Sequence, residues 1–341
     1  MKAHTLLSLL GLCLLAGQTA SVYAESPVAQ GDVFGCDAEG EDCPTSLPED
    51  EESTELPFFS FLDQPQETLS TGLANMATAM DEFFAEERVF YDKTGSYVRL
   101  TLDTVFDEEG GDSYTGDIKV KLQLPRTEEK LKLTFESDPD ESRDALDRTL
   151  EASPREAASE RAYFGGIQAT LGDERKWRFK PGIGVKFSKP IDIFLRLRID
   201  RNYKVGDWLF RPSQMFYTFK EKGFGSETAF DLDYQITDNI LFRSSSFIRY
   251  TDENDYYEPS QLFSLIHSIT PRRGMVYQAG VYGITEPSWH ATDYLAQVRY
   301  RQNIHSHFLF IELIPRVIYQ RENNFEAERS FMFRLEMIFE G

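Results

Sequence analysis

Few residues in this 341-residue chain have the types and spacing that catalysis requires. A hydrolase needs a nucleophile within hydrogen-bond reach of a base. His267 and Ser268 are adjacent in an alternating segment, so their side chains point to opposite faces of a strand and cannot pair. His290 stands in a predicted loop near a hydroxyl and two carboxylates, those of Ser288, Glu286 and Asp293. A surface histidine is the simpler explanation, and we predict neither an enzyme nor a cofactor.

Two cysteines, Cys36 and Cys43, follow the N-terminal leader with six residues between them. In an oxidising compartment such a pair can close a small loop. A metal site would need further Cys or His side chains nearby, and this segment contains none. We therefore predict a disulfide between Cys36 and Cys43 and no metal site.

Cationic side chains are the third kind of residue that could serve a chemical function. Seventeen Lys or Arg fall on the polar positions of alternating segments, against ten Asp or Glu. If those positions line a lumen, it is basic and favours anions. The alternative is a lattice of ion pairs that makes the barrel rigid and closes it. The proposed lumen residues are Arg99, Lys119, Lys121, Arg196, Arg198, Arg211, Arg243, Arg299, Arg301, Arg316 and Arg334.

The chain begins with the features of an export signal. Lys2 supplies a positive end, and the apolar run 6–15 is too short to cross a bilayer. A plausible cleavage site follows at 22–24, which predicts a signal peptide over 1–24. Cys13 is preceded by Leu12 where a lipoprotein signal has a small residue, so we assign Cys13 to the removed peptide.

Most of the formal charge of −21 comes from one segment. Residues 25–87 hold seventeen Asp or Glu and no Lys or Arg. Because residues 25 to about 57 are also poor in apolar side chains, we predict a disordered acidic periplasmic segment over 25–65. A chain of this charge repels nucleic acid, and we expect no such partner.

One amphipathic helix is predicted over 66–87. Apolar side chains recur there at helical spacing: Leu69, Leu73, Met76, Met80 and Phe83. The helix can pack on the periplasmic rim of a barrel or enter the lumen as a plug. We favour the rim.

From residue 88 to the end at 341 the apolar period changes to two, which predicts strands. Alternation is clearest at 191–200 and at 330–339. We count fourteen alternating segments, with twelve strands as the alternative. Pro181, Pro212 and Pro315 lie inside proposed strands and predict bulges or breaks, because proline cannot donate to the ladder.

Three features favour a transmembrane barrel over a soluble one. Fourteen strands would close at a backbone radius of roughly 14 Å, too wide for one layer of side chains to fill. Connections alternate between short turns and segments of mostly seven residues or more, the longest being 137–161. Aromatic residues gather at strand ends, among them Trp208, Tyr250 and Tyr319.

The last strand resembles the recognition signal that bacterial outer-membrane proteins present to the barrel-assembly machinery. The resemblance lies in its alternating apolar positions, Phe331, Phe333, Leu335, Met337 and Phe339, although the chain ends Glu340-Gly341 and not on the aromatic residue. Segments 308–315 and 333–339 are also similar to the end of uncharacterised proteobacterial outer-membrane barrel proteins. This resemblance covers about thirty residues and implies an architecture without an activity.

The sequence thus predicts an all-β, antiparallel transmembrane barrel over 88–341 in the outer membrane of a Gram-negative bacterium. Its N-terminal segment would be periplasmic, and its partners would be outer-membrane lipid and the assembly machinery. We predict a channel or transporter for small anionic solutes. A structural or surface-interaction barrel with a closed, ion-paired lumen is the alternative, and an outer-membrane hydrolase is the third.

Overall fold

The computed structural model describes residues 71–85, 95–108, 111–124, 131–137, 149, 163–172, 177–187, 191–221, 223–305 and 308–340. All but a few of the predicted features fall within these ranges. The signal peptide 1–24, the acidic segment 25–65 and the Cys36–Cys43 disulfide lie outside them. The described residues belong to one compact unit, Gln64–Gly341.

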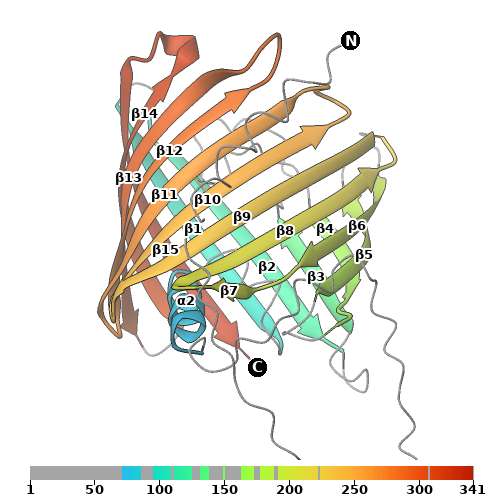
Figure 1. The fold of residues 1–341 in the computed structure, drawn as a ribbon, viewed down its shortest axis with the longest axis horizontal. Coiled ribbons are helices and arrows are strands. Elements are labelled where there is room, and N and C mark those ends of the chain that lie inside the picture. The colour runs from blue at the N-terminus through green and yellow to red at the C-terminus, as the bar shows by residue number, and fades with distance from the viewer. Residues whose placement is uncertain are drawn as a thin grey trace, which may run out of the picture. The chain divides into compact units, whose positions relative to one another are not determined.

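In the described residues the unit is a closed antiparallel β-barrel of fourteen strands with one helix, α2 (Thr71–Phe83). Figure 1 shows the curved wall and the helix at one end of it. The strands are β1 (Tyr97–Asp107), β2 (Ser113–Gln123), β3 (Leu131–Ser137), β4 (Tyr163–Ala169), β5 (Arg178–Phe187), β6 (Asp192–Asp200), β8 (Trp208–Phe219), β9 (Gly223–Thr237), β10 (Ile240–Thr251), β11 (Tyr257–Thr270), β12 (Arg273–Ile284), β13 (His290–His305), β14 (Leu309–Gln320) and β15 (Ala327–Glu340). A short strand, β7 (Tyr203–Val205), continues the line of β6 along β8. A 3₁₀ turn, η5 (Arg321–Asn323), joins β14 to β15.

Each strand pairs with its sequence neighbours, and the first strand pairs with the last. The β1–β15 ladder runs from Tyr97↔Glu340 to Asp107↔Ser330, which closes the wall. We call this pairing the seam. The prediction of fourteen strands is confirmed, because every expected segment overlaps one of these strands.

The predicted alternation between short and long connections is wrong at one end of the barrel. Four connections there that were expected to be long are short, because the strands extend into them. These connections are 220–222, 252–256, 285–289 and 321–326. Ladder hydrogen bonds continue beyond the point where side-chain alternation fades, as in β9, where Gly223 already pairs with Phe219. We call the rim that carries 238–239, 271–272 and the C-terminal end of β15 the turn end, and the opposite rim the loop end.

The three prolines interrupt the ladder as predicted. The β4–β5 pairing stops at Gln168↔Gly182, next to Pro181, and resumes as the isolated bridge Leu171↔Phe179. Opposite Pro212 the neighbouring strand is divided into β6 and β7. The β13–β14 ladder omits the pairs around Pro315. Each break follows from the missing N–H.

The two faces of the wall have inverted polarity compared with a soluble barrel. In β6 the side chains of Ile193 and Leu195 are 53% and 51% exposed, whereas Asp192 and Arg196 on either side of this pair are buried. The same alternation places large apolar residues on the outside of nearly every strand. Charged residues are buried in proteins almost only when they are paired. The inner face therefore needs partners for its charges, and α2 supplies some of them.

Candidate functional site

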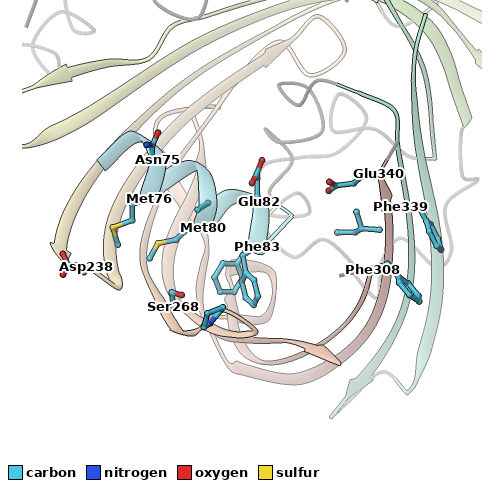
Figure 2. Close-up of a pocket in the computed structure, with 14 residues that line it drawn as sticks. Asn75, Met76, Met80, Glu82, Phe83, Asp238, Ser268, Phe308, Phe339 and Glu340 are labelled. Carbon is cyan, nitrogen blue, oxygen red and sulfur yellow. The ribbon is translucent and has the colours of Figure 1, made fainter. Parts of the chain in front are cut away.

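Helix α2 lies inside the wall at the turn end, and Figure 2 shows it within the ring of strands. Its buried face, formed by Leu73, Ala77, Met80 and Phe84, packs on inward side chains of four strands. Those side chains are Leu209, Leu241, Ile266 and Val276. The favoured prediction of a helix on the rim is wrong, and the alternative of a helix inside the lumen is correct. Apolar contacts with the inner wall bury more of the helix than a rim position would.

A glycine in the wall makes room for the end of α2. A Cβ built on Gly274 of β12 would lie 2.7 Å from Cζ of Phe84 and 3.0 Å from Cε1 of Phe83. Any larger residue would collide with these two rings. The wall is therefore shaped to receive this part of the helix.

A set of ion pairs holds the last turn of the helix, and we call it the helix clamp. Asp81 is buried, and its carboxylate accepts a 2.8 Å hydrogen bond from Nη1 of Arg211 on β8. Nη2 of Arg243 on β10 lies 2.6 Å from the other oxygen of Asp81. Both arginines also pair with Asp233 on β9. Two cations thus share two carboxylates, one from the helix and one from the wall.

Arginines also bind the C-terminal end of the helix. Nη2 of Arg299 donates to the carbonyl of Phe84 at 2.7 Å, and Nη1 of Arg99 donates to the carbonyl of Ala85 at 3.1 Å. These carbonyls belong to the negative end of the helix dipole, where cations are favourable. The guanidinium of Arg299 also lies 5.7 Å from the ring centre of Phe84.

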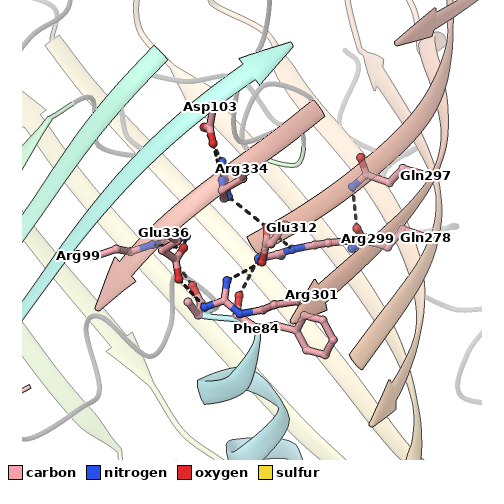
Figure 3. A network of polar contacts seen from close by, with 11 residues as sticks. Phe84, Arg99, Asp103, Gln278, Gln297, Arg299, Arg301, Glu312, Arg334 and Glu336 are labelled. Atoms are coloured by element: carbon pink, nitrogen blue, oxygen red, sulfur yellow. Dashed lines mark hydrogen bonds and ion pairs between the residues drawn. The ribbon is translucent and has the colours of Figure 1, made fainter. Parts of the chain in front are cut away.

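A continuous set of ion pairs surrounds this contact, and we call it the seam network (Figure 3). Its members come from β1, β13, β14 and β15: Arg99, Asp103, Arg299, Arg301, Glu312, Arg334 and Glu336. Arg301 donates 2.5 Å hydrogen bonds to both Glu312 and Glu336. Arg99 binds Glu336 at 2.9 Å, and Arg334 binds both oxygens of Asp103. Four arginines and three carboxylates, all buried, alternate across the seam.

A second group of charges lies on β5 and β6 around Asp200, and we call it the Asp200 cluster. Nε of Arg178 donates to Asp200 at 2.6 Å, and Nζ of Lys180 lies 2.9 Å from the same carboxylate. Nε of Arg198 lies 3.8 Å from it. Three cations therefore converge on one carboxylate. Next to them on β6, Nη2 of Arg196 lies 3.8 Å from Glu136 of β3.

The remaining sequence-predicted lumen residues also alternate with outward apolar side chains. Lys121 on β2 is buried, and Lys119 two positions before it is half-buried. Arg316 on β14 is buried and donates to the hydroxyl of Ser330 at 2.8 Å. The interior therefore holds all eleven proposed cations, but many of them are engaged with carboxylates.

Sequence reasoning missed three inward carboxylates: Asp81, Glu227 and Glu258. Glu227 is in phase with Asp231 and Asp233 on β9, and this spacing could have identified it. Glu258 pairs with Arg249 at 3.2 Å just where β11 begins. Asp81 falls on the same helical face as Ala77 and Phe84, so its charge on an apolar stripe was the available signal. These acids reduce the excess of positive charge inside the barrel.

The histidines do not form a catalytic pair among the described residues. His267 contacts the side-chain amide of Asn239 at 3.3 Å. Nδ1 of His290 donates to the backbone carbonyl of Ser288 at 2.8 Å and not to its hydroxyl. In the described ranges there is also no group of three or more His, Cys, Asp or Glu placed to hold a metal ion. No helix in these ranges is long and apolar enough to cross a membrane.

A cavity of about 1050 Å³ opens at the turn end beside α2. Figure 2 shows Met76, Glu82 and Phe83 of the helix on one side of it and Phe308 and Glu340 on the other. The helix therefore leaves space along the wall at this rim.

Comparisons with known proteins give similar barrels but no family. No family model matches the chain, and no curated protein matches it. It is similar to a bacterial polysaccharide outer membrane secretin, with 12% identity, a TM-score of 0.45, and coverage of 72% of this chain and 99% of that one. A loop-deletion mutant of OmpT, an outer membrane protein of Vibrio cholerae, has 8% identity, a TM-score of 0.43, and coverage of 72% and 100%. OprB of Pseudomonas putida has 9% identity, a TM-score of 0.43, and coverage of 76% and 97%. Likenesses at this level transfer no activity to this chain.

Proposed function

We propose that this protein is an outer-membrane β-barrel channel for small anionic solutes, with α2 as a constriction at one end of its lumen. The observation that carries the proposal is the inverted wall. Its outside is apolar, its inside is charged, and the barrel is closed without a free edge. A bilayer accepts this arrangement, because every strand finds its hydrogen-bond partners within the wall.

The aromatic residues support the membrane position. Trp208 and Tyr234 lie together at the turn end, with 4.9 Å between ring centres, and Tyr250 and Tyr257 lie together at the loop end, with 5.2 Å. Rings of this kind suit the two lipid–water boundaries. We assign the turn end to the periplasm, because barrels of this class have an even number of strands, and their first strand begins and their last strand ends on the periplasmic side.

The outward positions of β15 fit the proposed assembly signal. Phe331 and Phe339 are 37% and 46% exposed on the lipid side, and Phe333, Leu335 and Met337 alternate between them. We propose that the barrel-assembly machinery recognises this strand before it pairs with β1.

Planar-bilayer recording tests the channel. The purified protein should produce discrete conductance steps in KCl, and its reversal potential in a salt gradient should indicate a preference for chloride. A preference for potassium would contradict the anionic substrate class, and an absence of steps would contradict the channel.

The seam network favours one alternative, a structural barrel with a closed, ion-paired lumen. Its four arginines and three carboxylates are buried and joined by ion pairs, so they stiffen the wall and leave few cations for passing solutes. An Asp81→Asn variant separates the two functions. Weakening the helix clamp should raise the conductance of a channel, whereas a closed barrel should show no conductance with or without the substitution.

A further inference from the structure

A group of polar side chains lies on the outward face of four adjacent strands, β8 to β11 (Figure 1). Inward and outward positions alternate along the strands, and the buried residues Arg211, Asp233 and Arg243 mark the inward positions. The polar group has the opposite phase, and we call it the outer polar patch: Gln214, Thr228, Ser244, Ser246 and Gln261. By contrast, every outward position of β6 from Ile193 to Ile199 is aliphatic. The patch therefore interrupts the apolar surface that the wall presents to lipid.

The patch lies at the depth of the hydrocarbon core. On β10 the outward residues run from Phe242, next to the aromatic pair of the turn end, to Tyr250 in the aromatic pair of the loop end. Ser244 and Ser246 are the outward positions between them, and Ser246 faces Gln261 across the β10–β11 ladder. Hydrocarbon offers no hydrogen-bond partner, so a polar side chain at this depth is unfavourable unless another protein group binds it.

Hydrogen bonds within the patch offset part of this cost. The hydroxyl of Thr228 donates to Oε1 of Gln214 at 2.6 Å, and strands β9 and β10 bring this pair beside the other three residues. The hydroxyl of Ser246 donates to Oε1 of Gln261 at 2.5 Å, and Nε2 of Gln261 donates to the hydroxyl of Ser244 at 3.0 Å. Each hydroxyl and each carboxamide can both donate and accept, so the patch has capacity for further hydrogen bonds.

An apolar groove of about 640 Å³ adjoins the patch on the outward face. Phe263 lines the groove, is 47% exposed and lies two positions from Gln261 on β11. Ala279 and Ala296, paired across the β12–β13 ladder, line it with small, exposed side chains. In a bilayer, small side chains let two proteins approach closely and polar side chains bind them to each other, because lipid tails are as apolar as the wall. The two features that favour protein contact in a bilayer therefore lie side by side.

We propose that the outer polar patch and the adjoining groove form the surface on which a second copy of this chain docks within the membrane. Two-fold pairs are the commonest homo-oligomers, and they bring the same patch of both copies together. Such a patch must be complementary to itself. Hydroxyl and carboxamide groups meet this requirement because they both donate and accept, whereas a patch of like charges would repel its own copy. The inference depends on the membrane position of the wall and not on the passage of solutes.

Disulfide crosslinking in lipid vesicles tests the interface. The full chain, with Cys13, Cys36 and Cys43 replaced by Ser, receives one new cysteine at a time. Ser244→Cys and Ser246→Cys sample the patch, and Leu195→Cys is the matched control at an outward position of β6. All variants are reconstituted at the same low ratio of protein to lipid, oxidised with copper phenanthroline and separated on a non-reducing gel.

A dimer band severalfold stronger for at least one patch variant than for Leu195→Cys is the expected result. Adding Gln261→Leu to that variant should lower the dimer population by about threefold for each hydrogen bond lost across the interface. Leucine suits a lipid-facing position, so this substitution leaves the barrel folded, which the migration of unheated and heated samples on the gel checks.

Equal bands for the patch variants and Leu195→Cys would mean random collision and would overturn the proposal, as would the absence of a dimer band from both patch variants. The same oxidation in isolated outer membranes examines the identity of the partner. An adduct of the patch variants whose mass is not twice that of the chain would replace the second copy by a different protein and would also overturn the proposal.

Conductance of the same preparations separates this inference from the channel function. A crosslinked dimer without conductance would retain the interface and reject the channel. Conductance from a protein without patch-specific crosslinking would retain the channel and reject the interface.

Discussion

The seam network and the Asp200 cluster lie on the inner face of one wall, yet they arrange their arginines differently. At the seam, Arg301 is fully buried between Glu312 and Glu336 and bridges these two carboxylates. At β5 and β6, three cations lie around Asp200. The first arrangement is a chain of ion pairs that joins four strands, whereas the second is a local cluster on two neighbouring strands. We therefore expect the loss of one arginine to cost more stability at the seam than at the Asp200 cluster.

The largest expected effect comes from Arg301→Gln. This change leaves two buried carboxylates with fewer partners, and breaking a buried pair in this way costs about 3–5 kcal/mol. The free energy of unfolding, measured by urea titration in lipid vesicles, should fall by this amount. A loss below about 1 kcal/mol would show that the seam network does not hold the wall.

A smaller effect, equal in both regions, is expected on the lipid side. Leu313 lies next to Glu312 on β14, and Leu197 lies next to Arg198 on β6. Replacing either leucine by Arg should cost roughly 2–4 kcal/mol, because a cation at the membrane midplane is unfavourable. The same urea titration measures both variants. Unequal costs would mean that one of the two residues does not face lipid.

Asp81→Asn should have an intermediate effect that appears mainly in conductance. The substitution removes one of the two carboxylates that Arg211 and Arg243 share, so the helix clamp weakens while Asp233 remains. We expect about 1–3 kcal/mol less stability and more frequent or larger conductance steps. Asn75→Asp, on the exposed side of the helix, is a control that adds charge without touching the clamp. Unchanged conductance in Asp81→Asn would mean that α2 does not limit the path.

The smallest effect is expected for Arg198→Gln, the same chemical change as Arg301→Gln. The side chain of Arg198 is 20% exposed and its Nε lies 3.8 Å from Asp200, so its removal should lower the free energy of unfolding by less than about 1 kcal/mol. Urea titration beside Arg301→Gln makes the comparison direct. A loss as large as that of Arg301→Gln would place both arginines in structural roles.

The sequence predicted the wall well because alternation is a local signal. The alternation alone places Leu195 and Arg196 on opposite faces of the strand. Pro212 indicates a break in the ladder because it has no backbone N–H to donate. The partners of the charges were not predictable in this way. Arg301 and Arg198 look equivalent in sequence, because each is a polar position of an alternating strand. In the structure Arg301 bridges Glu312 and Glu336, whereas Arg198 lies 3.8 Å from Asp200. Pairing depends on strand register and on α2, which brings Asp81 to Arg211 across 130 residues.

The hydrogen bonds from two arginines to the C-terminal end of α2 link the helix to the closure of the barrel. Arg99 stands on the first strand and Arg299 on β13, so the carbonyls of Ala85 and Phe84 are held from the two sides of the seam. Helix docking and cylinder closure are then thermodynamically linked, since each completes the hydrogen bonds of the other. A closed seam is therefore more stable with α2 docked than without it. A chain that closes without it would bury Arg99 and Arg299 without these two acceptors.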